Sequence, residues 1–207
     1  ISNPGSQVLF LDPVAAAQQS IAELGRQGIN KIIVLSHLGF DRDIALARSV
    51  DGIDLVVGGH THTLLGPFET FGLEPEAGYP HAVKTGRGET TLIVQAWEWG
   101  KVLGVLELEF NEKGQVTACT GTPVILSGGK TERKQEGREM RRVNAAAGKT
   151  PGMEIIEEDQ DAANRVRTYA EPIDELYRKV IAAAGDNLPH VRRPDIRNPA
   201  GGVPEVS

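Results

Sequence analysis

The sequence predicts an α/β protein, and three features lead to this class. Two short β-branched runs, Lys31–Leu35 and Leu55–Val57, are each followed by histidine and glycine residues. Helical patterns lie before the first run and between the two runs. From about residue 90 onward, runs of strand-forming residues separated by turn signals indicate antiparallel strands. Strands that alternate with helices and are then followed by further strands favour the α/β class.

The first elements are a short strand and a helix. Val8–Leu11 is an apolar run of strand character. Asp12 and Pro13 then supply a helix N-cap and a first-turn proline, so we expect a helix through about Arg26. Gly28 follows as a stop signal.

A strand–helix–strand unit comes next. The strand that ends before His37 is followed by a helical pattern over Asp41–Ser49 and then by the strand that ends before His60. This order predicts a right-handed crossover between parallel strands. Both histidine-bearing strand ends should therefore lie on the same edge of one sheet.

The second half of the chain is richer in strands. Residues 68–90 indicate an irregular loop or a weak hairpin, and Thr90–Gln95, Val102–Phe110 and Val116–Leu126 indicate strands. Asn111–Gly114 is a turn signal between the last two. We expect these strands to form the antiparallel, outer part of a second sheet.

The remaining residues divide into three segments. Residues 128–153 are polar and basic, which indicates either an anion-binding patch or, as we favour, a solvated insertion. A long helix is expected from Glu154 to Ala184, broken or kinked at Pro172. Residues 191–207 have the composition of a linker.

Three histidines at the expected strand ends form the strongest candidate site. His37 follows one strand, and His60 and His62 follow the other. Neutral imidazole binds zinc and similar divalent ions well. If the second segment is extended, His60 and His62 point to the same side. We interpret the three as metal ligands rather than as unrelated histidines.

Glycines beside these histidines support the interpretation. Gly39, Gly58 and Gly59 allow a close approach of the backbone and a positive φ. Ligands of open α/β sheets also bind beyond the carboxyl ends of the strands.

Composition limits the partners that this chain can have. The formal net charge is −6 over 207 residues, which argues against nucleic acid, although bound metals would still allow a phosphate substrate. No apolar run approaches the roughly 18 residues that a transmembrane segment needs. Cys119 is the one cysteine, so an internal disulfide and a cysteine zinc site are excluded. We expect a buried, unreactive thiol.

Two motifs resemble a known family. Ser36-His-Leu-Gly39 and Gly58-Gly-His-Thr-His-Thr63 resemble the last two metal-binding motifs of the calcineurin-like metallophosphoesterases, in the branch of 5'-nucleotidases, UDP-sugar hydrolases and NAD nucleotidases. Ser2–Gly5 and Ile93–Lys101 also match this branch. The resemblance covers about residues 1–127 and continues more loosely beyond them.

The resemblance implies a fold and a chemistry. The fold would be the C-terminal half of a four-layer α/β/β/α sandwich, followed by a linker helix. The cofactors would be two divalent metal ions, Zn, Mn, Co or Mg. His37 and His60 would bind one metal and His62 the other. The substrate would be a nucleotide, and the location would be periplasmic or extracellular.

The family's first metal motifs have no counterpart in the sequence. No Asp-x-His and no Asn-His pair occurs, so the family's catalytic histidine is not matched and no residue here is assigned as catalytic. We expect a fragment that lacks an N-terminal half and a C-terminal domain. Its parts would be a partial catalytic domain (1–127), the polar insertion (128–153), the linker helix region (154–190) and the start of a substrate-binding domain (191–207).

Other possibilities remain open at the level of sequence. The chain could be a non-catalytic remnant with a partial metal site, or an amidohydrolase, another class that uses His-x-His. Trp97 and Glu98 could pack within a sandwich, which we favour, or Glu98 could hydrogen-bond a ligand histidine. His81 and His190 are expected to be solvent-exposed.

Overall fold

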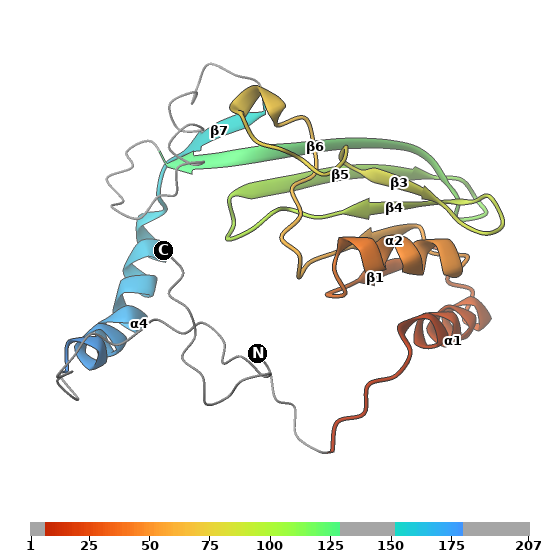
Figure 1. The fold of residues 1–207 in the computed structure, drawn as a ribbon, viewed down its shortest axis with the longest axis horizontal. Helices are drawn as coiled ribbons and strands as arrows, with labels where there is room; N and C mark the ends of the chain where they lie inside the picture. Colours follow the sequence, from red (N-terminus) through yellow and green to blue (C-terminus); the bar gives the residue numbers. More distant parts are fainter. Residues whose placement is uncertain (1–6, 129–151, 180–207) are drawn as a thin grey trace, which may run out of the picture. The chain divides into compact units, whose positions relative to one another are not determined.

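The computed structural model describes residues 7–128 and 152–179, and the chain divides into two units between Glu157 and Glu158. The described residues of the first unit form two β-sheets, two α-helices and a short 3-10 helix (Figure 1). The second unit contributes one described helix, α4 (Gln160–Arg178).

Helix α1 (Pro13–Arg26) begins and ends where its sequence signals lie. The Ala15 N–H donates to Asp12 Oδ1 at 2.8 Å, so Asp12 is the predicted N-cap. At the other end the Ile29 N–H donates to the Leu24 carbonyl, and Gly28 has a φ of 78°. A left-handed glycine of this kind closes many helices.

The first sheet has the order β1-β2-β4-β3. Its strands are β1 (Ile33–Leu35), β2 (Leu55–Val57), β4 (Thr90–Val94) and β3 (His81–Lys84). Strands β1, β2 and β4 are parallel, and β3 is antiparallel to β4. The predicted parallel pairing is confirmed, and α2 (Phe40–Ser49) is the connection between β1 and β2.

Strand β4 lies in a different sheet from the one expected. The sequence indicated a strand at this position but grouped it with the later antiparallel strands. It pairs instead with β2, with Val56 opposite Ile93. Four of its five residues, Thr91–Val94, are buried, as expected for a strand covered on both faces.

The second sheet has the order β5-β6-β7. Strands β5 (Val102–Phe110) and β6 (Val116–Gly128) form the predicted antiparallel hairpin. Strand β7 (Met153–Ile156) adds in parallel to β6. The expected helix start at Glu154 is therefore wrong, because β6 pairs with these residues. Helix α4 begins at Gln160, where Asp159 caps it, and continues through Pro172.

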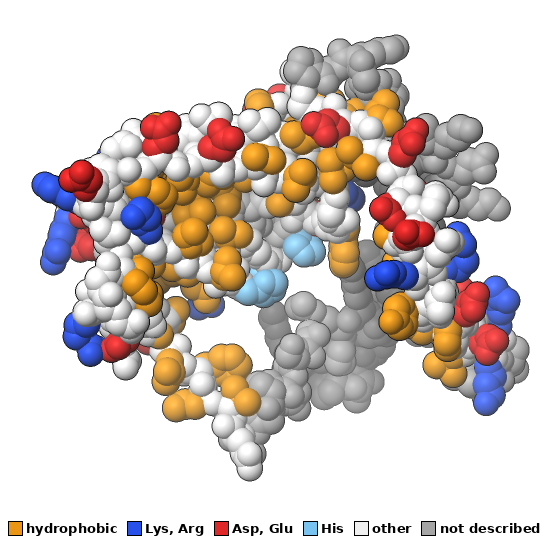
Figure 2. Space-filling model, turned by 180° about the vertical axis from the view of Figure 1, so that it is seen from behind, with side chains coloured by type: hydrophobic (Ala, Val, Ile, Leu, Met, Phe, Trp, Pro, Cys, Tyr) orange, Lys and Arg blue, Asp and Glu red, His pale blue; other side chains and the backbone are white. Residues whose placement is uncertain are grey.

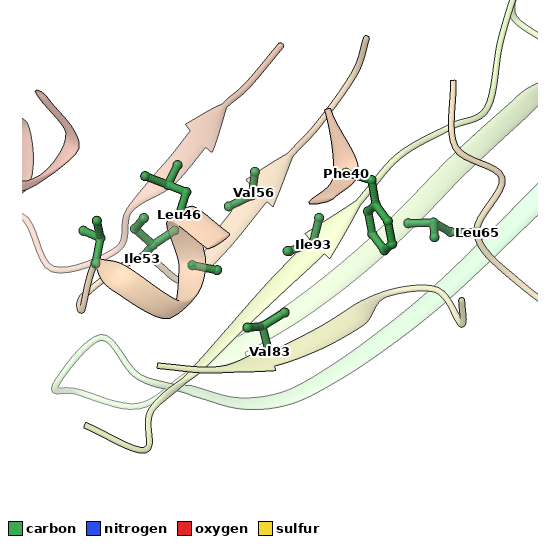
Figure 3. Close-up of a cluster of buried hydrophobic side chains, with 9 residues drawn as sticks. Phe40, Leu46, Ile53, Val56, Leu65, Val83 and Ile93 are labelled. Carbon is green, nitrogen blue, oxygen red and sulfur yellow. The ribbon is translucent and has the colours of Figure 1, made fainter. Parts of the chain in front are cut away.

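The core has one apolar layer on each face of the first sheet. On one face, side chains of α2 pack against Val56, Val83 and Ile93 (Figure 3). On the other face, Leu55, Leu92 and Val94 pack with Leu106 and Leu108 of β5. Helices, first sheet and second sheet therefore form three successive layers of the first unit. A fourth layer remains a prediction.

A smaller cluster lies beyond β2. The 3-10 helix η1 (Glu69–Phe71) contributes Phe71 to a group that also contains Leu64, Phe68, Val102 and Ile125. The loop that follows His62 therefore packs against the second sheet through these contacts.

Two expectations about buried residues are wrong. Val8–Leu11 forms no strand, and Leu9 and Phe10 are 81% and 80% exposed, because no described strand pairs with this run. Cys119 is exposed on β6. No helix in the described ranges combines the length and apolar character needed to cross a membrane.

Candidate metal and nucleotide site

The candidate residues emerge from one edge of the first sheet. The carboxyl ends of β1, β2 and β4 are adjacent, since the Ser36 N–H donates to the Val57 carbonyl and the Gly58 N–H donates to the Val94 carbonyl. The three segments that follow these strands therefore begin side by side. Such an edge is the usual binding region of an open α/β sheet.

His37 and His60 lie together at this edge. Their ring centroids are 5.2 Å apart and the ring planes cross at 67°. Both side chains are exposed, as is His62, and Figure 2 shows histidine side chains at the surface of the molecule. The expected proximity of His37 and His60 is confirmed.

Glycines make this approach possible. A Cβ on Gly59 would lie 3.1 Å from His37 Nδ1, and one on Gly39 would lie 2.8 Å from Thr61 Cγ2. Gly39 also has a φ of 97°, as predicted. Gly58 and Gly59 provide the expected close approach, but neither has a positive φ.

The positive φ values fall on the histidines themselves. His60 and His62 have φ of 72° and 53°, in the left-handed region that few residues other than glycine adopt. The segment is therefore not extended, so the prediction that His60 and His62 point to the same side of an extended strand is wrong. His62 is directed toward the segment after β4.

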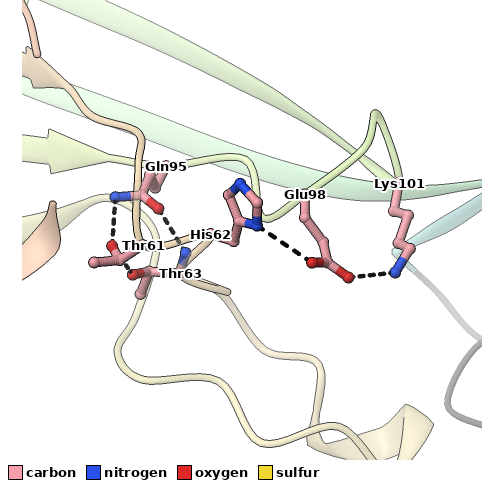
Figure 4. Close-up of polar contacts among 6 residues, drawn as sticks. All are labelled: Thr61, His62, Thr63, Gln95, Glu98 and Lys101. Carbon is pink, nitrogen blue, oxygen red and sulfur yellow. Dashed lines mark hydrogen bonds and ion pairs between the residues drawn. The ribbon is translucent and has the colours of Figure 1, made fainter. Parts of the chain in front are cut away.

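His62 contacts an acidic side chain of that segment. Its Nδ1 lies 3.4 Å from Glu98 Oε2 (Figure 4). Its ring also packs edge-on against Trp99, with the ring centroids 5.5 Å apart. Lys101 Nζ donates to Glu98 Oε1 at 2.5 Å. The pKa of Glu98 is lowered, mainly by this bond from Lys101 and to a smaller degree by His62.

The contact of Glu98 with His62 corrects the preference for simple packing. A carboxylate that accepts from one imidazole nitrogen leaves the other nitrogen available to a ligand. Trp97 does pack against the cluster around η1, and the Lys101 ammonium lies 4.6 Å from its ring centroid. Trp97 and Trp99 share the left-handed backbone, with φ of 56° and 55°.

Two buried polar residues beneath the site were missed by the sequence analysis. Asp43 has no exposed surface, and its Oδ1 accepts from Ser36 Oγ at 2.5 Å. Its Oδ2 is buried without a hydrogen-bond partner, and burial raises the pKa of this carboxyl. A signal existed, because Asp43 shares the apolar face of α2 with Phe40, Leu46 and Ala47.

Gln95 is the second missed residue. It follows β4 and is 3% exposed. Its side chain contacts Thr61 and Thr63, on either side of His62 (Figure 4). It also donates to the Gly59 carbonyl, just before His60. The available signal was a polar residue that directly continues a fully apolar strand run.

A cavity opens beside His62. Its volume is about 540 Å³. Three segments line it: the loop that contains His62, the segment after η1 and the loop after β4. The first contributes Thr61, His62, Thr63 and Leu64, the second Gly72, Leu73, Glu74 and Glu76, and the third Trp97.

The three histidines do not converge on one point within the part of the chain that the structure describes. The described residues contain no group of three or more His, Cys, Asp or Glu side chains arranged to hold one ion. His37 and His60 are adjacent, whereas His62 contacts Glu98.

The two other histidines have different outcomes. His81 is half-buried in β3, and its ring packs on Phe40 at 5.3 Å, so the expectation of a solvent-exposed histidine is wrong. Strand pairing with β4 draws it onto the core. His190 lies outside the described residues, as do most of the polar insertion and the linker.

The sequence relatives found by comparison with known proteins are described as 5'-nucleotidases. No protein-family model matches the chain. A protein of Treponema pallidum described as a probable 5'-nucleotidase is 32% identical over 217 residues, covering 98% of this chain and 37% of that protein. The 5'-nucleotidase of Rattus norvegicus is 42% identical over 128 residues, or 61% of this chain. A snake venom 5'-nucleotidase of Crotalus adamanteus is also 42% identical over 128 residues.

Solved structures agree with the sequence relatives. The 5'-nucleotidase precursor of Thermus thermophilus has a TM-score of 0.69 and 41% identity, covering 88% of this chain and 31% of that one. The NAD nucleotidase of Haemophilus influenzae has a TM-score of 0.74 and 28% identity, covering 87% and 38%. The chain spans 22–37% of the length of the sequence relatives given above.

Proposed function

Since this chain belongs to the 5'-nucleotidase family, we propose that the complete protein hydrolyses a phosphate ester or pyrophosphate bond of a nucleotide with the help of two divalent metal ions. The observation that carries the proposal is the pairing of His37 and His60, with ring centroids 5.2 Å apart at the carboxyl ends of adjacent parallel strands.

The three histidines are proposed as metal ligands. His37 and His60 would serve one ion and His62 the other, following the family motifs that they match. The contact of Glu98 with His62 Nδ1 supports this role, because it orients the ring and leaves Nε2 free. Bound divalent ions of this kind lower the pKa of a water and stabilise charge on a transferring phosphoryl group.

Further ligands must come from elsewhere in the complete protein. Three neutral imidazoles offset none of the repulsion between two dications, which needs anionic ligands. We therefore propose that carboxylates outside this chain complete the site. The family's catalytic histidine would come from there as well.

The substrate class and location follow the relatives. Nucleoside monophosphates and nucleotides with a pyrophosphate bond are both proposed, because the relatives include 5'-nucleotidases and an NAD nucleotidase. A periplasmic or extracellular location is proposed, and the snake venom relatives support it.

Activity of the complete protein tests this function. We expect release of phosphate or nucleoside with added Mn²⁺, Co²⁺ or Zn²⁺, and loss of that release after chelation. His60→Ala should remove most of the activity, because a metal ligand is lost, whereas His190→Ala should change little. Hydrolysis that resists chelation, or full activity of His60→Ala, would contradict the proposal.

A further inference from the structure

One buried side chain holds the loop that carries His60 and His62. Gln95 Nε2 donates to the Gly59 carbonyl at 3.1 Å, and Gln95 Oε1 accepts from the Thr63 N–H at 2.5 Å. These two contacts lie immediately before His60 and immediately after His62. One carboxamide therefore spans the whole His-Thr-His segment.

The loop has few other backbone contacts. Within it, the Thr61 N–H donates to the Gly59 carbonyl at 2.9 Å. Thr61 Oγ1 accepts from the Phe40 N–H at 3.1 Å and also lies 3.4 Å from Gln95 Nε2. A loop with left-handed residues at two positions needs such outside contacts to stay in one conformation.

Gln95 is well placed for a fixed role. It is 3% exposed and follows β4, whose residues Thr91–Val94 are buried in the centre of the sheet. A Cβ on Gly58 would lie 3.3 Å from Gln95 Nε2 and 2.4 Å from Asp43 Oδ2, so the carboxamide packs closely against the backbone of the loop. Its donor and acceptor groups both form hydrogen bonds within the protein.

We propose that Gln95 is a positioning residue that fixes the conformation of the His60–His62 loop and so sets the geometry of both metal-binding imidazoles. The part that concerns metal binding rests on the proposed function. The part that concerns the loop rests on the hydrogen bonds alone.

Gln95→Met in the complete protein is the main variant, because it keeps the length of the side chain and removes both polar groups. The control is Thr91→Val. Thr91 lies on the same strand, is fully buried and donates its hydroxyl to the Ile53 carbonyl at 2.7 Å, away from the loop. Each variant removes the hydrogen bonds of one buried side chain: Thr91 lies within β4, and Gln95 follows it directly.

Two measurements distinguish positioning from general stability. Hydrogen exchange of the peptide that contains Thr63, measured without metal, should become about tenfold faster in Gln95→Met, since a hydrogen bond of ordinary strength is lost. Co²⁺ affinity should fall about tenfold, with a changed Co²⁺ absorption spectrum. Thr91→Val should leave the exchange, the affinity and the spectrum as in the wild type.

If Gln95→Met does not fold, Gln95→Glu tests whether Gln95 positions the His60–His62 loop. It keeps the acceptor for the Thr63 N–H and removes the donor to the Gly59 carbonyl. We expect retained protection at Thr63 with weaker Co²⁺ binding.

Several outcomes would overturn the proposal. They are wild-type exchange and Co²⁺ affinity in Gln95→Met, equal losses in Thr91→Val, and wild-type Co²⁺ affinity in Gln95→Glu. If the wild-type protein binds no Co²⁺, the proposed function fails, and hydrogen exchange alone decides the role of Gln95.

Discussion

Asp43 shows how a single residue links the core to the site. It lies on α2, has no exposed surface and accepts from Ser36 Oγ, whose oxygen in turn accepts from the Leu38 N–H at 3.1 Å. These contacts hold the backbone on both sides of His37. Burial raises the pKa of the Asp43 carboxyl above its ordinary value, and the hydrogen bond from Ser36 offsets part of this effect.

Asp43→Asn should stabilise the protein in a pH-dependent way. The ordinary aspartate pKa is 3.8, and the folded value is higher. Below the ordinary value both states are protonated, so the two proteins should differ least there. Between the ordinary and the raised pKa, the free energy of unfolding of the wild type falls as the pH rises, because folding requires the carboxyl to bind a proton that the unfolded chain has lost. Above the raised pKa the carboxyl is ionised in both states, so the free energy of unfolding changes no further with this group. The advantage of Asp43→Asn should therefore grow with pH and then level off.

Urea unfolding at a series of pH values measures this effect. Asp41→Asn is the control, because Asp41 lies on the same helix and is exposed. A stability difference between wild type and Asp43→Asn that does not change with pH would contradict the raised pKa.

At the scale of elements, the sequence predicted the features that depend on neighbouring residues, such as helix ends and turns. The Asp12 cap, the Gly28 stop and the turn at Asn111–Gly114 each lie where the sequence indicated. The parallel pairing of β1 and β2 followed from strand–helix–strand order. His37 and His60 met for the same reason.

Elements that depend on distant partners were predicted less well. Strand β7 forms because β6 pairs with it, and its four residues carry no strong strand signal. Strand β4 pairs with β2 and β3 in the first sheet, whereas β5, the next strand in sequence, lies in the second sheet. Sequence signals marked Gln95 and Asp43 as buried polar residues, but their hydrogen-bond partners lie on other elements and could not be predicted.

The turn after β2 should tolerate no side chain at Gly58. A Cβ there would lie 2.4 Å from Asp43 Oδ2, with little room for either group to move. We expect Gly58→Ala to lower the free energy of unfolding by about 1–3 kcal/mol, as for other overpacked positions. Denaturant midpoints at one pH provide the measurement.

Gly25 offers a matched comparison for that variant. It lies within α1, and a Cβ there would have no neighbour within 4 Å. Gly25→Ala should instead raise stability by about 0.5–1 kcal/mol. Equal and small effects at both glycines would show that the contact with Asp43 is unimportant.

At the scale of the whole molecule, the first unit exposes much apolar surface. Leu9, Phe10 and Leu11 are 70–81% exposed, and Leu35 on β1 is 83% exposed. Strand β1 is also an end strand of its sheet, so one side of it carries no described partner strand. Figure 2 shows apolar side chains spread over the face that it displays.

The 207-residue chain on its own should therefore self-associate. Exposed apolar surface beside an open strand edge favours pairing with another chain. Light scattering coupled to size-exclusion chromatography should give a mass that rises with concentration. Leu35→Lys should reduce this rise, whereas Thr117→Lys, at an exposed polar position on β6, should not. A monodisperse wild-type monomer would be the contrary result.

The left-handed backbone at His60 and His62 affects how the site can be redesigned. Asparagine and aspartate enter this region at lower cost than alanine or β-branched residues. A saturation library at either position is thus filtered first by the backbone and only then by chemistry. An alanine variant removes the imidazole and also disfavours the loop, whereas an asparagine variant mainly removes the imidazole. Function lost in both reports the missing ring; function lost in alanine alone reports the turn.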